Sequence, residues 1–251
     1  MLAWCEKMLD SLNATFGRER LFADAAARRD IDRLVDRLPL QQDHRILYIG
    51  CGKGSGALEL EARGFRHIVA VDRPEHGIAT ARNRGWARSS SVYFIEADAP
   101  AYLFPRLSYD AVVLARGAFA DETDAATALV TFHSALRTGG RLALEVIDGD
   151  WLRANFETEI TEEMPHGGII VRQRSLEGSK LTTHLVAIEG DDTVVVDRTY
   201  SERIYGRSQI EATLRAAGFL DIAVTSHVCA PPHIESDATS NVQRLFFTAR
   251  A

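Results

Sequence analysis

The segment RILYIGCGKGSG, at positions 45–56, is an apolar run that breaks into alternating glycines, and two acidic residues follow it. A strand that ends in GxGxG and leads into a helix has backbone N–H groups at its end and lacks the Cβ atoms that would keep a ligand away. Asp72 lies about 20 residues beyond the glycines, where a carboxylate can accept both hydroxyls of a ribose. Asp98 ends a later apolar run, where it can accept a hydrogen bond from the exocyclic amine of an adenine-like ring. The pattern predicts a nucleotide-like ligand.

Two classes of ligand compete for this glycine loop. Residues 52–57 match the GxGxxA pattern of a dinucleotide site, and Asp72 would serve NAD equally well. However, the glycines begin directly after Ile49 and give a looser loop than the pyrophosphate turn, and Asp98 has no role in the dinucleotide scheme. We therefore favour a single adenosyl ligand and keep an NAD-linked oxidoreductase as an alternative.

The elements around the loop alternate between short apolar strands and helical patterns. Such alternation indicates right-handed βαβ units and a parallel sheet that is covered on both faces. The predicted strands are HRILYIG, HIVAVD, SVYFIEAD, YDAVVLAR and RLALEVID.

The character of the sequence changes after Asp148. A helical segment, DGDWLRANFE, precedes three strand patterns separated by Gly-Ser and Gly-Asp-Asp, namely GGIIVRQRSL, KLTTHLVAIE and TVVVDRTYSERIY. This indicates a small antiparallel sheet of three strands inserted into the α/β domain. A helix, SQIEATLRAAGF, and two strands, DIAVTSHV and QRLFFTAR, complete the chain.

In their order and intervals, these segments resemble the class I S-adenosylmethionine-dependent methyltransferases. The likeness is strongest over about residues 46–146 and looser toward the C-terminus, and it is carried by ILYIGCGKGSG, VAVDRPEHGIATAR, FIEADA, YDAVVLARGAF and LRTGGRLALEV. The resemblance implies an α/β fold with a Rossmann-like seven-stranded sheet, six strands parallel and one antiparallel, and with helices on both faces. The expected division is an N-terminal helical cap (1–40), a cofactor-binding core (41–150), an inserted antiparallel lid (151–205), and a C-terminal helix and β-hairpin that complete the core (206–251).

The resemblance also implies roles for individual residues. The glycines would line the methionine part and the ribose of S-adenosylmethionine, Asp72 the ribose hydroxyls, and Asp98 with Ala99 the adenine. Arg73 could stack on the adenine, and Arg116 could bind the methionine carboxylate or an acidic acceptor. The product would be S-adenosylhomocysteine. The implied cofactor-binding residues are Tyr48, Gly50, Cys51, Gly52, Gly54, Asp72, Arg73, Asp98, Ala99 and Arg116.

Tyr48 departs from the family pattern, which commonly has Asp or Glu at this position to help hold the ammonium group of the methionine moiety. An aromatic ring could instead offer its face to a cation, an interaction worth about 0.5–2 kcal/mol. The alternative is an enzyme that binds S-adenosylmethionine but cyclises or cleaves it without methylation.

The acceptor site is expected to involve the inserted sheet. Arg172 and Arg174 share one face of their strand by alternation, and we expect Arg203 and Tyr205 to share a face as well. One interpretation is a lid that grips an anionic or hydroxylated small molecule, and the other is a solvent-exposed face or a homodimer surface. The candidates for the substrate pocket are Phe119, Arg174, Arg203 and Tyr205. No residue is assigned as a catalytic base.

Composition limits the functional class. The chain has 251 residues with a formal net charge of -6, which argues against a generic nucleic-acid binder because such affinity depends on a basic face. The three cysteines are scattered, without the spacing of a metal site or a disulfide framework. The sequence contains no long apolar stretch that would indicate a membrane segment or a signal peptide. We therefore expect a cytoplasmic methyltransferase that transfers a methyl group to the nitrogen or oxygen of a small molecule, and a non-catalytic partner subunit is a further alternative.

Overall fold

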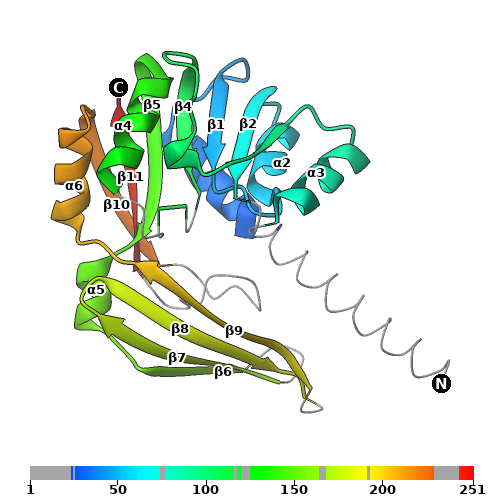
Figure 1. Cartoon of the computed structure of the whole chain (residues 1–251), viewed down its shortest axis with the longest axis vertical. Helices are drawn as coiled ribbons and strands as arrows, with labels where there is room; N and C mark the ends of the chain where they lie inside the picture. The colour runs from blue at the N-terminus through cyan, green and yellow to red at the C-terminus, as the bar shows by residue number, and fades with distance from the viewer. Residues whose placement is uncertain are drawn as a thin grey trace.

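The computed structural model describes residues 24, 26–73, 77–115, 118–119, 125–163, 168–190, 193–228 and 243–251. Within these ranges the chain forms two sheets. A seven-stranded sheet with helices on both faces carries most of the core, and a four-stranded sheet runs below one of its edges (Figure 1).

The seven-stranded sheet has the strand order β10-β11-β5-β4-β1-β2-β3. Strands β1 to β5 pair in parallel, whereas β11 is antiparallel to both of its neighbours, β5 and β10. Six strands therefore run one way and one runs the other way, as the sequence predicted. Their bounds are β1 Arg45–Ile49, β2 His67–Asp72, β3 Tyr93–Glu96, β4 Tyr109–Leu114, β5 Leu136–Ile147, β10 Leu220–Val228 and β11 Gln243–Arg250.

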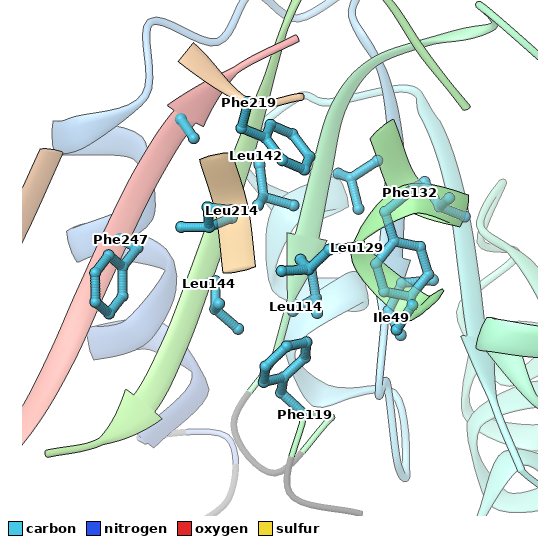
Figure 2. Close-up of a cluster of buried hydrophobic side chains, with 14 of the residues drawn as sticks. Ile49, Leu114, Phe119, Leu129, Phe132, Leu142, Leu144, Leu214, Phe219 and Phe247 are labelled. Carbon is cyan, nitrogen blue, oxygen red and sulfur yellow. The ribbon is translucent and has the colours of Figure 1, made fainter. Parts of the chain in front are cut away.

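Two apolar clusters, one on each face, hold the helices against this sheet. Figure 2 shows the cluster under α4 (Ala125–Ala135) and α6 (Arg207–Ala216), in which Phe132 and Leu214 meet side chains of β4, β5 and β11. The opposite cluster holds a helix over residues 26–37, α2 (Ser55–Ala62) and α3 (Ile78–Ala87). Burial on both faces explains why the strands read as nearly continuous apolar runs.

The N-terminal region of the predicted cap is described only in part. Residues 26–37 form a helix, and Ile31 and Leu34 of this helix are buried against the sheet together with Leu38, which follows it. Residues 1–23 lie outside the described ranges. No helix in the described ranges is both long and apolar enough to cross a membrane.

The four-stranded sheet has the order β6-β7-β8-β9 and is antiparallel throughout. The expectation of three strands was wrong, because Glu159–Glu163 forms a fourth strand, β6, at the edge beside β7. Its sequence, EITEE, lacks an apolar alternation, and it becomes a strand through backbone pairing with its neighbour. The other bounds are β7 Ile169–Glu177, β8 Lys180–Ile188 and β9 Val194–Arg203.

The four-stranded sheet joins the core through a short helix, α5 (Gly149–Ala154). The Asp148 carboxylate accepts hydrogen bonds from the N–H groups of Asp150 and Trp151, which caps this helix, and also from the Gln243 side chain of β11. The N–H of Gly149 donates to the carbonyl of Tyr205 at 3.0 Å. The chain therefore leaves the core and returns to it at adjacent positions.

Tyr48 has an unusual neighbour at the start of α2. Side chains of β1 alternate between the two faces, so Tyr48 lies with Ile46 in the cluster beneath α2 and is buried. A Cβ atom added to Gly56 would lie 2.2 Å from the Tyr48 hydroxyl oxygen. Glycine at position 56 therefore makes room for the phenol ring.

This packing predicts the sign of one substitution. Alanine normally stabilises a helix relative to glycine by up to about 1 kcal/mol. Here Gly56→Ala should instead lower the free energy of unfolding by about 1–3 kcal/mol, because the new methyl group overlaps the Tyr48 side chain. Urea unfolding followed by circular dichroism measures the change. In a Tyr48→Leu background the same substitution should be neutral or stabilising, and stabilisation in the wild-type background would contradict the packing.

Candidate functional site

The carboxyl ends of β1, β2, β3 and β4 meet at one edge of the seven-stranded sheet. The glycine loop begins there, with positive φ angles of 77° at Gly50, 51° at Gly52 and 88° at Gly54. The N–H groups of Gly50 and Cys51 donate to the Val71 carbonyl at 2.8 and 3.2 Å, which holds the loop beside the end of β2. A Cβ at Gly50 would lie 2.5 Å from that of Ala118, so the loop after β4 approaches at the same point.

Asp72 links the glycine loop to the end of β2. Its Oδ2 accepts a hydrogen bond from the N–H of Gly52, and its Oδ1 accepts one from the N–H of Arg73 at 2.8 Å. The side chain is buried, with 8% of its surface exposed. An ionised carboxylate accepts backbone N–H groups strongly, so the Asp72 carboxylate fixes the turns that leave two strands.

Asp98 and Ala99 follow β3 at the same edge. The Asp98 side chain is half-exposed, and its Oδ1 lies 3.3 Å from the Nε of Arg73. Ala99 is buried and begins a short 3₁₀ helix, Ala99–Ala101. The structure thus brings Arg73 and Asp98 together as an ion pair, beside the Asp72 turn.

Tyr48 and Cys51, two further residues of the predicted cofactor set, are also buried. Tyr48 packs beneath α2, against Gly56, instead of standing at the open edge. Cys51 is also buried, and desolvation together with the nearby Asp72 charge raises the pKa of its thiol to about 12. The Cys51 thiol is therefore neutral near pH 7 and unsuited to act as a nucleophile.

Arg116 of the predicted cofactor set lies outside the described residues. The four predicted acceptor residues differ in where they lie. Phe119 and Tyr205 come together, since both are buried and their ring centroids are 5.4 Å apart. Figure 2 shows the Phe119 ring at the end of the apolar cluster, below Leu114. The loop after β4 therefore contacts the segment that returns from the four-stranded sheet.

Arg174 and Arg203 lie on opposite faces of the four-stranded sheet. Arg174 is buried together with Arg172, which confirms that these two share a face, whereas Arg203 is exposed. The expectation that Arg203 and Tyr205 share a face was wrong, because β9 ends at Arg203 and Tyr205 forms an isolated bridge with Asp148. A strand alternation holds only while the strand continues.

Sequence reasoning missed a buried polar group centred on Glu145 in β5. The Glu145 carboxylate lies 3.2 Å from Nη1 of Arg33, 3.6 Å from Nε2 of His227 and 3.8 Å from Nε of Arg244. It ties the helix over residues 26–37 to β5, β10 and β11. An acidic residue inside the apolar run RLALEVID was the available signal.

The described residues contain no group of three or more His, Cys, Asp or Glu side chains arranged to hold a metal ion. The charged side chains beside the glycine loop include Asp72, Arg73 and Asp98. Together with the glycine loop, they form a polar surface at the ends of consecutive parallel strands, the position at which open α/β sheets bind ligands.

Comparison with known proteins agrees with this geometry. Residues 46–140 match a family model described as a methyltransferase domain. The demethylmenaquinone methyltransferase of Thermus thermophilus is 36% identical over 118 residues, which cover 47% of this chain and 51% of that protein. The 27-O-demethylrifamycin SV methyltransferase of Amycolatopsis mediterranei is 32% identical over 131 residues, covering 51% and 46%. The chain thus spans about half the length of these relatives.

Solved structures match over nearly the whole chain. An S-adenosylmethionine-dependent methyltransferase from Clostridium acetobutylicum aligns with a TM-score of 0.67 at 14% identity, covering 98% of both chains. The amino pentose methyltransferase CalS10 from Micromonospora echinaspora, solved with S-adenosylmethionine bound, aligns with a TM-score of 0.58 at 20% identity, covering 97% of both. Residues 46–140 therefore match a methyltransferase domain, and the chain as a whole shares its fold with solved S-adenosylmethionine-dependent methyltransferases.

Proposed function

We propose that this protein transfers a methyl group from S-adenosylmethionine to a nitrogen or oxygen of a small-molecule acceptor and releases S-adenosylhomocysteine. The observation that carries the proposal is the Asp72 carboxylate, hydrogen-bonded to the N–H groups of Gly52 and Arg73 at the end of β2, within the segment that matches a methyltransferase domain.

The residues at this edge fit an adenosyl ligand. Gly50 and Gly52 present backbone without side chains, which allows close approach of the methionine part and the ribose. Asp72 would bind the ribose hydroxyls, and the half-exposed Asp98 with Ala99 would bind the adenine. Arg73 would contribute through its ion pair with Asp98, because that pair orients the Asp98 carboxylate.

S-adenosylmethionine, when bound, supplies an electrophilic methyl group on a sulfonium. The protein's task is then to align the acceptor with that group and to exclude water. Phe119 and Tyr205 suit this role, since their paired rings lie between the loop after β4 and the base of the four-stranded sheet. A dedicated base is required only where the acceptor has a high pKa.

The packing of Tyr48 removes the reason for expecting cleavage or cyclisation of the cofactor. The tyrosine replaces the usual acid, but its ring is accommodated by Gly56 beneath α2. A structural accommodation of this kind gives no support to a different reaction. The relatives described above are named methyltransferases, and their names give demethylmenaquinone and 27-O-demethylrifamycin SV as acceptors. Those names support a small-molecule acceptor for this chain.

The proposal includes a cytoplasmic enzyme that uses neither nucleic acid nor a membrane as substrate. The net charge of -6 supports it, because a polyanion binder needs a basic face.

Product analysis tests the reaction. Incubation of the purified protein with S-adenosylmethionine and a small-molecule extract should yield S-adenosylhomocysteine together with a product heavier by one methyl group, both resolved by mass spectrometry. Without the extract, S-adenosylhomocysteine should not accumulate. Methylthioadenosine as the main product would overturn methyl transfer, and calorimetric binding of NADH without binding of S-adenosylmethionine would overturn the cofactor.

A substitution at Asp72 tests the cofactor site. Asp72→Asn should weaken S-adenosylmethionine binding by about 10- to 100-fold, because it removes the charge from an acceptor of several hydrogen bonds. Isothermal titration calorimetry measures the affinity. Glu96→Gln is the matched control, since Glu96 ends β3 at the same edge and pairs with Arg82. Equal losses in both variants, or none in Asp72→Asn, would contradict the assignment.

A further inference from the structure

A row of polar side chains crosses the middle of the four-stranded sheet. Arg174 of β7 lies directly opposite Thr183 of β8, and Thr183 lies opposite Tyr200 of β9. Side chains at such paired positions lie on the same face, with Cβ atoms about 5 Å apart. Thr183 is fully buried and Arg174 is 6% exposed, so the row belongs to the covered face of the sheet.

This face is the one that turns toward the core. Leu181, two residues before Thr183 on β8, points to the same side and packs with Ile147 at the end of β5 and with Leu152 of α5. In Figure 1 the four-stranded sheet continues from α5 below the edge at which β5 ends. The row therefore lies on the side of the insertion that faces the carboxyl ends of the parallel strands.

The Arg174 guanidinium is held in a fixed orientation. Its Nε donates to the Glu157 carbonyl at 2.9 Å, and its Cζ lies 5.3 Å from the centroid of the Phe156 ring. The backbone N–H of Arg174 donates to the Thr158 carbonyl at 2.7 Å. The segment between α5 and β6 thus fixes one side of the guanidinium.

Two polar atoms of this row are buried and have no hydrogen-bond partner among the residues that the structure describes, Nη1 of Arg174 and Oγ1 of Thr183. Burial also lowers the pKa of Arg174, because desolvation disfavours its charge. A buried guanidinium without an ion-pair partner is costly to a fold, and its unmatched N–H group calls for a partner such as an ion or a ligand.

Arg172 provides an internal comparison. It lies two residues away on the same strand and face and is even more buried, at 2% exposure. Its Nη1 is 2.6 Å from the Glu162 carboxylate of β6, so the sheet provides a counter-charge for this arginine. The described residues provide no carboxylate in ion-pair contact with Arg174. The same strand therefore carries one arginine that is neutralised internally and one with an N–H group available.

We propose that Arg174, with the Thr183 hydroxyl, binds an anionic group of the acceptor, a carboxylate or a phosphate. A guanidinium and a hydroxyl offer several N–H and O–H donors to oxyanions of both kinds. The inference rests on the proposed function, because it assigns the class of acceptor for the same site. It also gives the insertion a chemical role beyond covering the cofactor edge.

The first experiment measures anion binding without turnover. Thermal unfolding is followed in sodium chloride, sodium acetate and sodium phosphate at equal ionic strength, for the wild type, Arg174→Met and Arg203→Met. Arg203 is the matched control, since it carries the same charge on the exposed face of the same sheet, at the end of β9. The extra rise in Tm produced by the anion should be lost in Arg174→Met and kept in Arg203→Met. A larger effect of acetate indicates a carboxylate, and a larger effect of phosphate indicates a phosphate group.

The Tm in sodium chloride separates a binding role from a structural one. Arg174→Met removes a desolvated charge and keeps an unbranched side chain against Phe156, so its Tm should equal or exceed that of the wild type. A fall in Tm together with an unchanged response to anions would identify Arg174 as a structural residue and overturn the proposal.

The second experiment uses acceptors in matched pairs that differ only in the anionic group, such as a hydroxybenzoate against its methyl ester and an amino alcohol phosphate against the parent amino alcohol. The wild type should prefer the anionic member, and Arg174→Met should lose about 10- to 100-fold in kcat/KM for that member alone. Its affinity for S-adenosylmethionine should be unchanged in calorimetry.

The outcomes separate this inference from the proposed function. Equal methylation of both members by the wild type and by Arg174→Met would overturn the anion site and leave methyl transfer standing. Weakened S-adenosylmethionine binding in Arg174→Met would assign the arginine to the cofactor, and so overturn its role in acceptor binding. The absence of S-adenosylhomocysteine in every reaction would count against the proposed function, whereas a response to anions that depends on Arg174 would still support the site.

Discussion

The Asp72 carboxylate accepts hydrogen bonds from backbone N–H groups of two turns, one after β1 and one after β2. The arrangement of the whole edge depends on these hydrogen bonds. Parallel strands bring their carboxyl ends to one side of a sheet, but they do not by themselves fix the loops that follow. A buried carboxylate between two such loops does so, because each N–H group would otherwise lose its partner. Glycine at positions 50 and 52 adopts the positive φ angles of this loop without the strain that a side chain would cause.

The two sheets differ in the side chains that cover their faces. The seven-stranded sheet is stabilised by apolar clusters on both faces and provides a rigid edge. The four-stranded sheet has a mixed covered face, in which Leu181 and Leu185 alternate with Thr183 across from buried arginines. Polar residues on a covered face weaken apolar packing, because a buried guanidinium needs a partner that replaces its lost hydration. This difference fits the proposals above, in which the core binds the cofactor and the insertion binds the acceptor.

Much of the core was predictable from the sequence, because apolar runs, glycines and strand-end acids are local signals. The five parallel strands β1 to β5 and the positions of Asp72 and Asp98 at strand ends followed from them, whereas the single antiparallel strand was implied by the family resemblance. The strand Glu159–Glu163 was not predictable, since it has no hydrophobic pattern and forms by pairing with β7. The row formed by Arg174, Thr183 and Tyr200 depends on the register between three strands, and single-sequence patterns do not give register. The room that Gly56 leaves for the Tyr48 side chain is likewise a feature of the packing between β1 and α2, which the sequence pattern does not show.

The hydrogen bond between Gly149 and Tyr205 brings together the two points at which the chain leaves the core and returns to it. A segment whose ends already meet can change in length or sequence while the strands on either side keep their positions, because closing it costs the core no rearrangement. The segment between Gly149 and Tyr205 can thus be replaced as a unit during evolution. Proteins that share this scaffold can therefore differ in the inserted segment while they keep the glycine loop and the strand ends around it unchanged.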